Sequence, residues 1–180
     1  MTIFNLYIFT KRGTLLHYAE FFRPVSTLRS LGIEEDSKLM FGLLLSLKLL
    51  MNGMNPNPTP PVPLANSPDA NGALPGFGPE QGFFRFSTDS YTLFHLEVPT
   101  GYKFVITGDS AAGDLRPSLW TLYETIFTSY AMKNICYIPG TPIKTVGFIA
   151  AVDSFIRSLP GFSPPPQLQQ QLQGQQIGRI

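Results

Sequence analysis

The sequence contains very few of the side chains from which metal and disulfide sites are built. It has one cysteine, Cys136, and two histidines, His17 and His95. A single cysteine excludes an intramolecular disulfide and is typical of a reducing compartment. A zinc site would need more ligands, and no cysteine or histidine spacing in this chain supplies them. We therefore expect no metal centre.

These three residues have simple structural interpretations instead. Each histidine falls in the middle of an expected strand, which favours a position at the surface or the edge of a sheet. Cys136 is interpreted as a small buried apolar residue. A nucleophilic thiol would need a histidine nearby in space, and the neighbourhood of Cys136 does not specify lipid acylation.

Strong charge and long apolar runs are also absent. The formal net charge is +1 and no basic cluster stands out on any expected element, which argues against a nucleic-acid-binding protein. The longest apolar run, Leu39–Met51, has about 13 residues and includes Lys48, whereas a membrane-spanning helix needs roughly 20. Met1–Phe9 lacks the basic leader of a signal peptide. We expect a soluble cytoplasmic protein.

Motifs of catalysis and cofactor binding are missing as well. Gly108–Asp114 lies between an expected strand and an expected helix, as a phosphate-binding loop does, but it lacks the Gly-Lys-Ser/Thr ending and any GxGxxG spacing. It is better explained as a turn and a helix cap. There is no GxSxG motif, and the carboxylates are scattered. We predict no catalytic, cofactor-binding or metal-binding residues, no cofactor, and no enzymatic activity.

The chain does contain a compact run of short strands. Gly82–Asp109 reads as three strands rich in aromatic and β-branched residues. Asp89-Ser90 provides the first tight turn between them and Pro99-Thr100-Gly101 the second. This run predicts a scaffold that presents surfaces.

A hairpin is expected at the N-terminus. Ile3–Phe9 and Thr14–Glu20 flank a turn whose Gly13 supplies a positive φ. Alternation along the first strand places two sets of residues on opposite faces. One set is Phe4, Leu6 and Ile8, and the other is Ile3, Asn5, Tyr7 and Phe9.

Three helices complete the predicted pattern. The first follows an irregular connector, Phe21–Gly32, has Glu34, Glu35 and Asp36 in its first turn, and ends near Met51. The second begins near Asp114 as its N-cap, and the third covers Thr145–Ser158. Their expected inward faces are Leu115, Leu119, Leu122, Ile126 and Tyr130 for the second, and Val146, Ile149, Val152, Ile156 and Leu159 for the third.

This order predicts an α+β fold. A five-stranded antiparallel sheet with helices on both faces is the natural solution for strand–strand–helix–strand–strand–strand–helix–helix. We predict one domain over residues 1–162. Asn52–Gln81, rich in Pro, Asn and Gly, is interpreted as a disordered insertion within it, and residues 163–180 as a disordered Pro/Gln-rich tail.

The first helix has more apolar surface than one sheet contact requires. Its expected core face consists of Leu39, Met40, Leu43, Leu44, Leu47, Leu50 and Met51. A second row, Phe41, Leu45 and Leu49, lies outside that face. Either Phe21–Gly32 or the long insertion covers this row, or another subunit does. We favour the second explanation, because large exposed apolar patches commonly mark interfaces.

Seven local motifs, in this order, resemble a known family. They are Asn5-Leu6-Tyr7-Ile8-Phe9, Leu16-His17-Tyr18, Lys38-Leu39-Met40-Phe41-Gly42, Gly82-Phe83, Tyr91-Thr92-Leu93, Pro99-Thr100-Gly101-Tyr102-Lys103 and Asp153-Ser154-Phe155-Ile156-Arg157-Ser158-Leu159-Pro160. Together with the element order, they look like the small longin-type, Bet-type core subunit of the TRAPP vesicle-tethering complex, in the sedlin/synbindin-like group. The likeness covers about residues 2–51 and 82–162.

The resemblance implies a longin, or profilin-like, fold and a role in an assembly. That assembly tethers vesicles between the endoplasmic reticulum and the Golgi and exchanges nucleotide on a Rab GTPase. The implied partners are other TRAPP core subunits, longin-type and Bet3-type, and the GTPase through the complex. Membrane association at the endoplasmic reticulum and cis-Golgi is implied only through the complex.

Other protein classes remain as alternatives. A small subunit of a vesicle coat adaptor has the same fold and is the main alternative. A fusion protein with a longin domain would need a heptad-repeat helix after Pro160, which the sequence lacks. A small α/β enzyme is disfavoured, because the constellations of a catalytic site are missing.

Overall fold

The computed structural model describes residues 1–22, 28–54, 82–110 and 112–162. Its elements are β1 (Ile3–Phe9), β2 (Leu15–Glu20), α1 (Leu28–Met54), β3 (Phe83–Ser87), β4 (Thr92–Glu97), β5 (Lys103–Gly108), α2 (Arg116–Thr121), η1 (Leu122–Met132) and α3 (Val146–Ser158). The five strands form one antiparallel sheet in the order β2-β1-β5-β4-β3. The predicted α+β fold is confirmed, and the sheet order is consistent with a longin-like fold.

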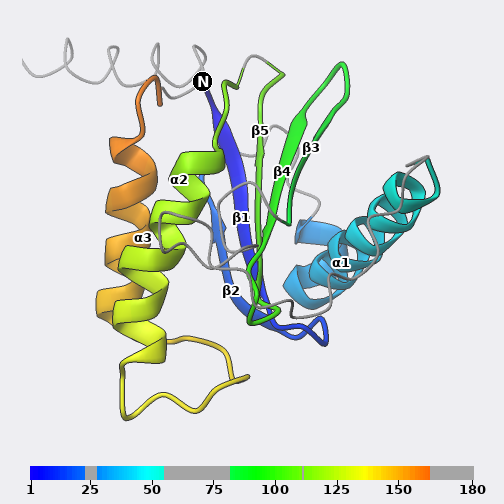
Figure 1. The fold of residues 1–180 in the computed structure, drawn as a ribbon. Coiled ribbons are helices and arrows are strands. Elements are labelled where there is room, and N and C mark those ends of the chain that lie inside the picture. The colour runs from blue at the N-terminus through cyan, green and yellow to red at the C-terminus, as the bar shows by residue number, and fades with distance from the viewer. Residues whose placement is uncertain (23–27, 55–81, 111, 163–180) are drawn as a thin grey trace, which may run out of the picture.

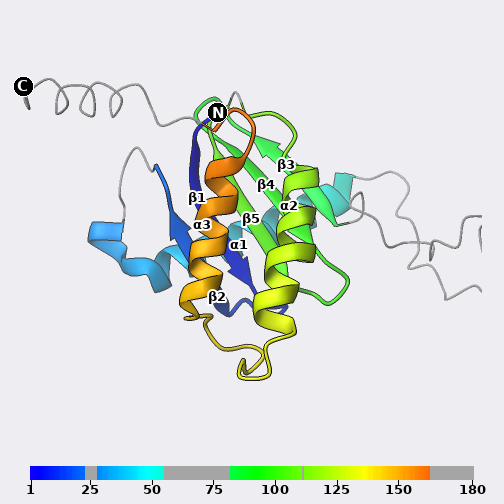
Figure 2. The same cartoon turned by 90° about the vertical axis from the view of Figure 1, so that its left-hand side faces the viewer.

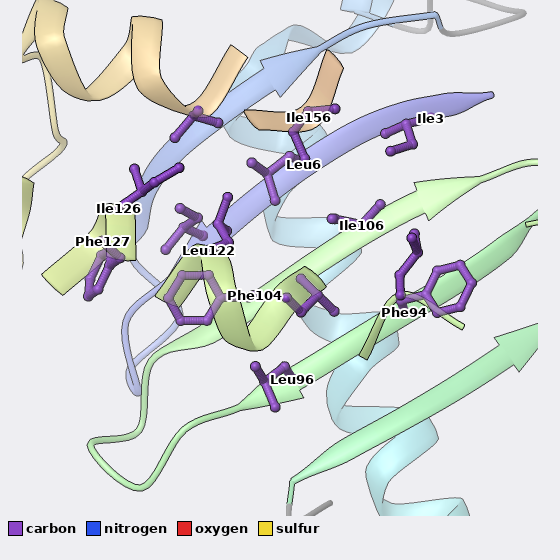
Figure 3. Close-up of a cluster of buried hydrophobic side chains, with 14 of the residues drawn as sticks. Ile3, Leu6, Phe94, Leu96, Phe104, Ile106, Leu122, Ile126, Phe127 and Ile156 are labelled. Carbon is purple, nitrogen blue, oxygen red and sulfur yellow. The ribbon is translucent and has the colours of Figure 1, made fainter. Parts of the chain in front are cut away.

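The sheet lies between two helical layers (Figure 1). Of the described helices, only α1 crosses one face, while α2, η1 and α3 cover the other face, where η1 and α3 lie side by side (Figure 2). The larger core fills the space between the sheet and α2, η1 and α3. Figure 3 shows part of it, including Leu6 of β1, Phe104 of β5 and Phe127 of η1.

Strand β1 is buried because both helical layers cover it. Leu6 and Ile8 belong to the larger core, whereas Tyr7 and Phe9 belong to the smaller core under α1. The predicted alternation holds for these residues but is wrong for Ile3, which lies in the larger core. A register shift between Ile3 and Asn5 against β5 explains the difference, because a shift of one residue exchanges the faces.

The two predicted turns that contain Gly13 and Gly101 are both present, and each glycine has a positive φ. Gly13 has φ 89° in the β1–β2 turn and Gly101 has φ 87° in the β4–β5 turn. Both positions are next to a neighbouring side chain. A Cβ at Gly13 would lie 2.6 Å from the ring of Phe41, and one at Gly101 would lie 2.9 Å from Lys11 Cβ. These turns therefore need glycine for space as well as for backbone conformation.

Helix α1 is longer than predicted. It is assigned from Leu28, within the expected connector, and is interrupted at Gly32, which has φ 77° and ψ 160°. At its other end it continues to Met54, so residues 52–54 belong to the helix and not to the insertion. The rest of the predicted insertion, residues 55–81, and the predicted tail, residues 163–180, lie outside the described residues.

The second predicted helix has an unexpected winding. It begins with α2 at Arg116, where Asp114 Oδ1 accepts a hydrogen bond from the Arg116 N–H at 3.0 Å, although the N-cap position itself is Leu115. From Leu122 onward it is a π-helix, η1. Bonding from i to i+5 accommodates more residues in each turn. Ala131 therefore faces the core, and the predicted Tyr130 does not.

The third predicted helix is correctly placed but rotated from its expected orientation. Val152, Ile156 and Leu159 are buried as predicted. Val146 and Ile149 were expected to face inward and are exposed, and Phe148 occupies the core between them. Phe148 packs there against β2, with its ring centre 5.1 Å from that of His17.

Candidate subunit interface on helix α1

Helix α1 uses one side to hold the sheet. Leu44 and Leu47 are buried, and they pack in the smaller core with Tyr7, Phe9 and Val105. Met40, Phe41 and Leu43 are partly buried at the margins of the same core. This contact fixes which side of the helix remains open.

Polar anchors hold the helix at both ends of this contact. Near its start, the hydroxyl of Tyr7 donates a 2.6 Å hydrogen bond to Asp36 Oδ2 in a buried position. Near its end, Lys48 Nζ lies 2.6 Å from Glu97 Oε2, and Lys103 Nζ lies 3.0 Å from Glu97 Oε1. The carboxylate of Asp36 therefore contacts the sheet, whereas Glu34 and Glu35 are exposed in the first turn after Gly32.

The ion-pair network around Glu97 runs from the buried Lys103 to the half-exposed Lys48. Burial alone would raise the pKa of Glu97, but hydrogen bonds from Lys48 and Lys103 outweigh it and hold the pKa below its ordinary value. Lys103 is itself buried and its ammonium lies 6.0 Å from the centre of the Phe41 ring. The carboxylate thus neutralises a buried cation and connects it to α1.

The three predicted interface residues do not have equivalent positions. Leu45 and Leu49 are 44% and 72% exposed. Phe41 is partly buried, with its ring 5.5 Å from that of Phe9, and it closes over Gly13 of the β1–β2 turn. Within the described residues, the open surface therefore includes Leu45 and Leu49, while Phe41 supports the helix from the sheet side.

Part of the predicted core face is also open. Leu39 and Leu50 were expected to face the sheet but are 63% and 54% exposed, and Met51 is exposed as well. The anchors to Tyr7 and Glu97 orient the helix so that Phe41 turns inward and Leu39 and Leu50 turn outward. Met51 lies on the same side as the buried Leu44 and Leu47, so this orientation does not explain its exposure. Helical spacing alone could not reveal this orientation, since leucine occupies nearly every side of the helix.

The open side of α1 combines leucines with small residues. Steps of 100° per residue place Gly42 and Ser46 between Leu45 and Leu49 on one side and Leu39 and Leu50 on the other. A Cβ at Gly42 would meet no atom within 4 Å, and Ser46 Oγ bonds back to the Gly42 carbonyl at 3.0 Å. We call Leu39, Leu45, Leu49 and Leu50 the α1 leucine surface. Because Gly42 and Ser46 at the centre of this surface have small side chains, a second helix could approach closely there.

His17 lies on the edge strand β2, as expected, but both histidines are buried, and His95 lies on an inner strand, which corrects the surface or edge position expected for it. Phe148 of α3 covers His17, although β2 is an edge strand, and His95 stacks on Phe84 with ring centres 4.3 Å apart. Burial lowers the pKa of each histidine to about 4. Both imidazoles are therefore neutral at physiological pH, and they contribute to packing.

Cys136 also differs from its prediction. It is exposed in the loop between η1 and α3, where its N–H bonds to Asn134 Oδ1 at 3.0 Å. The expectation of burial rested on residue type alone, and the position of Cys136 outside any helix or strand was the signal against it.

Asp109 lies in the segment that was compared with a phosphate-binding loop. Its side chain accepts a 2.7 Å hydrogen bond from the Thr2 N–H and so joins the end of β5 to the start of β1.

No helix in the described part of the chain is long and apolar enough to cross a bilayer.

A second group of exposed apolar side chains was missed by the sequence patterns. It includes Ile135, Ile138 and Val146, around the loop from η1 to α3. These residues were assigned to a connector or to an inward helix face, so their exposure was not expected.

The sequence matches a model of the sybindin-like family over residues 3–159, from β1 through α3. It is similar to trafficking protein particle complex subunit 1 of Homo sapiens and of Rattus norvegicus. To each it is 32% identical over 165 residues, which span 91% of this chain and 97% of the relative. The subunit 1 of Dictyostelium discoideum is 31% identical over 161 residues, which span 89% and 99%. The similarity therefore includes every element that supports the α1 leucine surface.

Proposed function

The chain belongs to the sybindin-like family, and we propose that it is a non-catalytic subunit of a trafficking protein particle complex. Similarity along nearly the whole of both chains supports this assignment, because a subunit's contacts are distributed over its surface. The names of the relatives place them in a particle that acts in trafficking.

The observation that carries the proposal is the α1 leucine surface. Four leucines are largely exposed on one helix, while the same helix already packs Leu44 and Leu47 against the sheet. Burying an exposed leucine stabilises a contact by about 1 to 2 kcal/mol. The four leucines would supply part of the apolar surface of a subunit contact, with Leu45 and Leu49 as predicted contact residues and Phe41 as the residue that holds the helix beneath them.

The finer function follows from the resemblance of the motifs. We propose that the complex tethers vesicles travelling from the endoplasmic reticulum to the Golgi, and that this chain contributes to a composite surface for a Rab GTPase. A surface without an active site promotes nucleotide release if it binds the empty GTPase more tightly than the loaded one. The chain would then act by binding and positioning alone.

The proposed partners are the longin-type and Bet3-type subunits of the complex, with the GTPase bound by the assembly. The proposed location is the cytoplasm, at the surface of endoplasmic reticulum and cis-Golgi membranes. The two helical layers support several simultaneous contacts, because α1 and the α2, η1 and α3 layer face away from each other across the sheet (Figure 1).

Affinity purification from cells tests the proposal. The full-length tagged chain should recover subunits of a trafficking protein particle complex, identified by mass spectrometry, in stoichiometric amounts. A matched purification of the Leu45→Asp/Leu49→Asp variant should lose the subunit that covers α1. Recovery of the large chains of a vesicle coat in their place would support the adaptor alternative, and recovery of neither group would overturn both.

A further inference from the structure

Three loops at one end of the domain form a second surface. Register places the β1–β2 turn beside the β4–β5 turn, because Phe9 pairs with Lys103, and Gly101 lies against Lys11. The loop from η1 to α3 reaches the same end, where Ile143 N–H bonds to the Leu16 carbonyl at 2.8 Å. Figure 1 shows these loops together at the end of the sheet away from the N-terminus.

The charged residues within these three loops are all basic, and Glu97, at the end of β4 beside them, is paired with Lys48 and Lys103. The β1–β2 turn carries Lys11 and Arg12, and the loop from η1 to α3 carries Lys133 and Lys144. Neither of these loops, nor the β4–β5 turn between them, contains an Asp or a Glu. All four basic residues are exposed. We call these four residues, together with Ile135 and Ile138, the basic end.

Two isoleucines project from the basic end. Ile135 is 99% exposed and Ile138 is 69% exposed. The two isoleucines are three residues apart in one loop and lie between Lys133 and Lys144 along the chain. Apolar side chains flanked by lysines are characteristic of segments that lie in the interface of an anionic membrane.

The loop that carries the isoleucines is held in shape by its own hydrogen bonds. Tyr137 N–H bonds to the Asn134 carbonyl at 3.0 Å, and the Tyr137 hydroxyl bonds to the Thr141 carbonyl at 2.8 Å. Thr141 Oγ1 donates to the Ile138 carbonyl at 2.7 Å. These bonds satisfy backbone groups near the tip, so insertion of Ile135 and Ile138 into headgroups would not leave those groups unpaired.

We propose that the basic end binds the surface of an anionic lipid bilayer directly. Lys11, Arg12, Lys133 and Lys144 would lie against the lipid phosphates and carboxylates, and Ile135 and Ile138 would enter the headgroup layer. The charge of these loops favours this occupant over an uncharged membrane. The inference is independent of the subunits that cover α1, and it gives this chain a membrane contact of its own in addition to any contact made by the complex.

Cys136 makes a direct test possible. It is the only cysteine, it is exposed, and it lies between Ile135 and Tyr137. The full-length chain would be labelled there with an environment-sensitive fluorophore. It would then be mixed with vesicles of about one third phosphatidylserine and two thirds phosphatidylcholine, or of phosphatidylcholine alone. We expect a blue shift and co-sedimentation with the anionic vesicles only, both weakened by salt.

Variants separate the roles of charge and apolar insertion. Each charge removed by Lys133→Gln or Lys144→Gln should weaken partitioning about fivefold. Ile135→Ser/Ile138→Ser should abolish the blue shift. Lys38→Gln, an exposed lysine of α1, is the matched control and should leave partitioning unchanged. All five positions are exposed, so folding should be preserved, as circular dichroism would verify.

Three results would overturn the proposal. One is equal binding to phosphatidylcholine vesicles and anionic vesicles. Another is vesicle binding that is unaffected by the isoleucine and lysine variants. The third is a label on Cys136 that becomes buried when the purified complex assembles without lipid, since this would show that a protein subunit occupies the basic end.

Discussion

Lys48 and Glu97 join helix α1 to strand β4, with Nζ 2.6 Å from Oε2. The other carboxylate oxygen lies 3.0 Å from the buried ammonium of Lys103 on β5. Glu97 is therefore the shared counter-ion of two lysines that differ in their exposure. This arrangement explains how a helix with leucine on almost every side is held in one rotational position.

We predict that Glu97→Gln lowers the free energy of unfolding by about 3 kcal/mol, because Lys103 would remain buried without its carboxylate. Lys48→Met should change it by less than about 1 kcal/mol, since the Lys48 side chain is half exposed. Urea denaturation of both variants measures the difference. Equal effects from the two substitutions would show that the buried lysine does not dominate the network.

Acid should destabilise the protein well above the pKa of its carboxylates. Burial lowers the pKa of His17 and His95 from 6.5 to about 4 in the folded state. Below pH 6.5 the unfolded chain therefore binds more protons than the folded chain, and stability falls as the pH decreases. At pH 5 the loss should be about 2 kcal/mol for each histidine relative to pH 7.

Denaturation at a series of pH values checks this expectation. The His17→Leu/His95→Leu variant should show a flatter profile between pH 7 and pH 5. Glu97 does not contribute in this window, because its pKa lies below 4.5 in the folded state and its stabilisation is lost only at lower pH. A profile of unchanged slope in the double variant would contradict the burial of neutral imidazoles.

Leu45→Asp should leave the domain folded and remove a subunit contact. Its side chain is 44% exposed, so the free energy of unfolding should change by less than about 1 kcal/mol. Ile149→Asp on α3 is a matched control, because Ile149 has the same exposed fraction and lies on the opposite helical layer. The subunit that binds α1 should no longer co-purify with the Leu45→Asp variant. It should still co-purify with the Ile149→Asp variant.

A buried leucine of the same helix provides the contrasting case. Leu44→Ala should lower the free energy of unfolding by about 3 kcal/mol, because it opens a cavity under α1. It leaves the α1 leucine surface chemically unchanged. If Leu45→Asp destabilised the domain as much as Leu44→Ala does, the loss of partners could no longer be attributed to the surface.

Gly13→Ala should be more destabilising than Gly140→Ala. Both glycines have φ near 90°, so both substitutions carry the cost of a left-handed backbone, about 1 kcal/mol. Only at Gly13 would the new Cβ meet the Phe41 ring, at 2.6 Å. We expect an additional loss of about 1 to 2 kcal/mol there, measured by thermal or urea unfolding. Equal losses would show that Phe41 moves aside freely.

The strands could be predicted because their signals are local. Alternation placed β1 over Ile3–Phe9, and Gly13 and Gly101 marked turns in which they have positive φ. The exception, Ile3, depends on a register shift against β5, which is distant in sequence.

The helices were located for the same local reasons, but the residues predicted to face inward were only partly correct. Tyr130 and Ala131 exchanged roles because η1 is wound as a π-helix, which periodicity of 3.6 residues does not anticipate.

The candidate interface shows the same division. Excess leucine on α1 was visible in the sequence, and two residues of the predicted second row, Leu45 and Leu49, are exposed. It could not separate Phe41 from them or show that Leu39 and Leu50 face outward. Those outcomes depend on Tyr7, Phe9 and Glu97, which contact α1 from strands far away in the sequence or across the sheet.

The sequence by itself determined the order of strands and helices, the α+β class and the family, because each depends on residues close together in the chain. Only the tertiary structure decided which leucines of α1 remain open, that His17 and His95 are buried, and that the loops with Lys11, Arg12, Lys133 and Lys144 lie at the same end of the sheet. The physical reason is that exposure and burial are set by contacts between segments far apart in the chain. Local patterns establish that an element forms, whereas packing decides which of its sides is left for a partner.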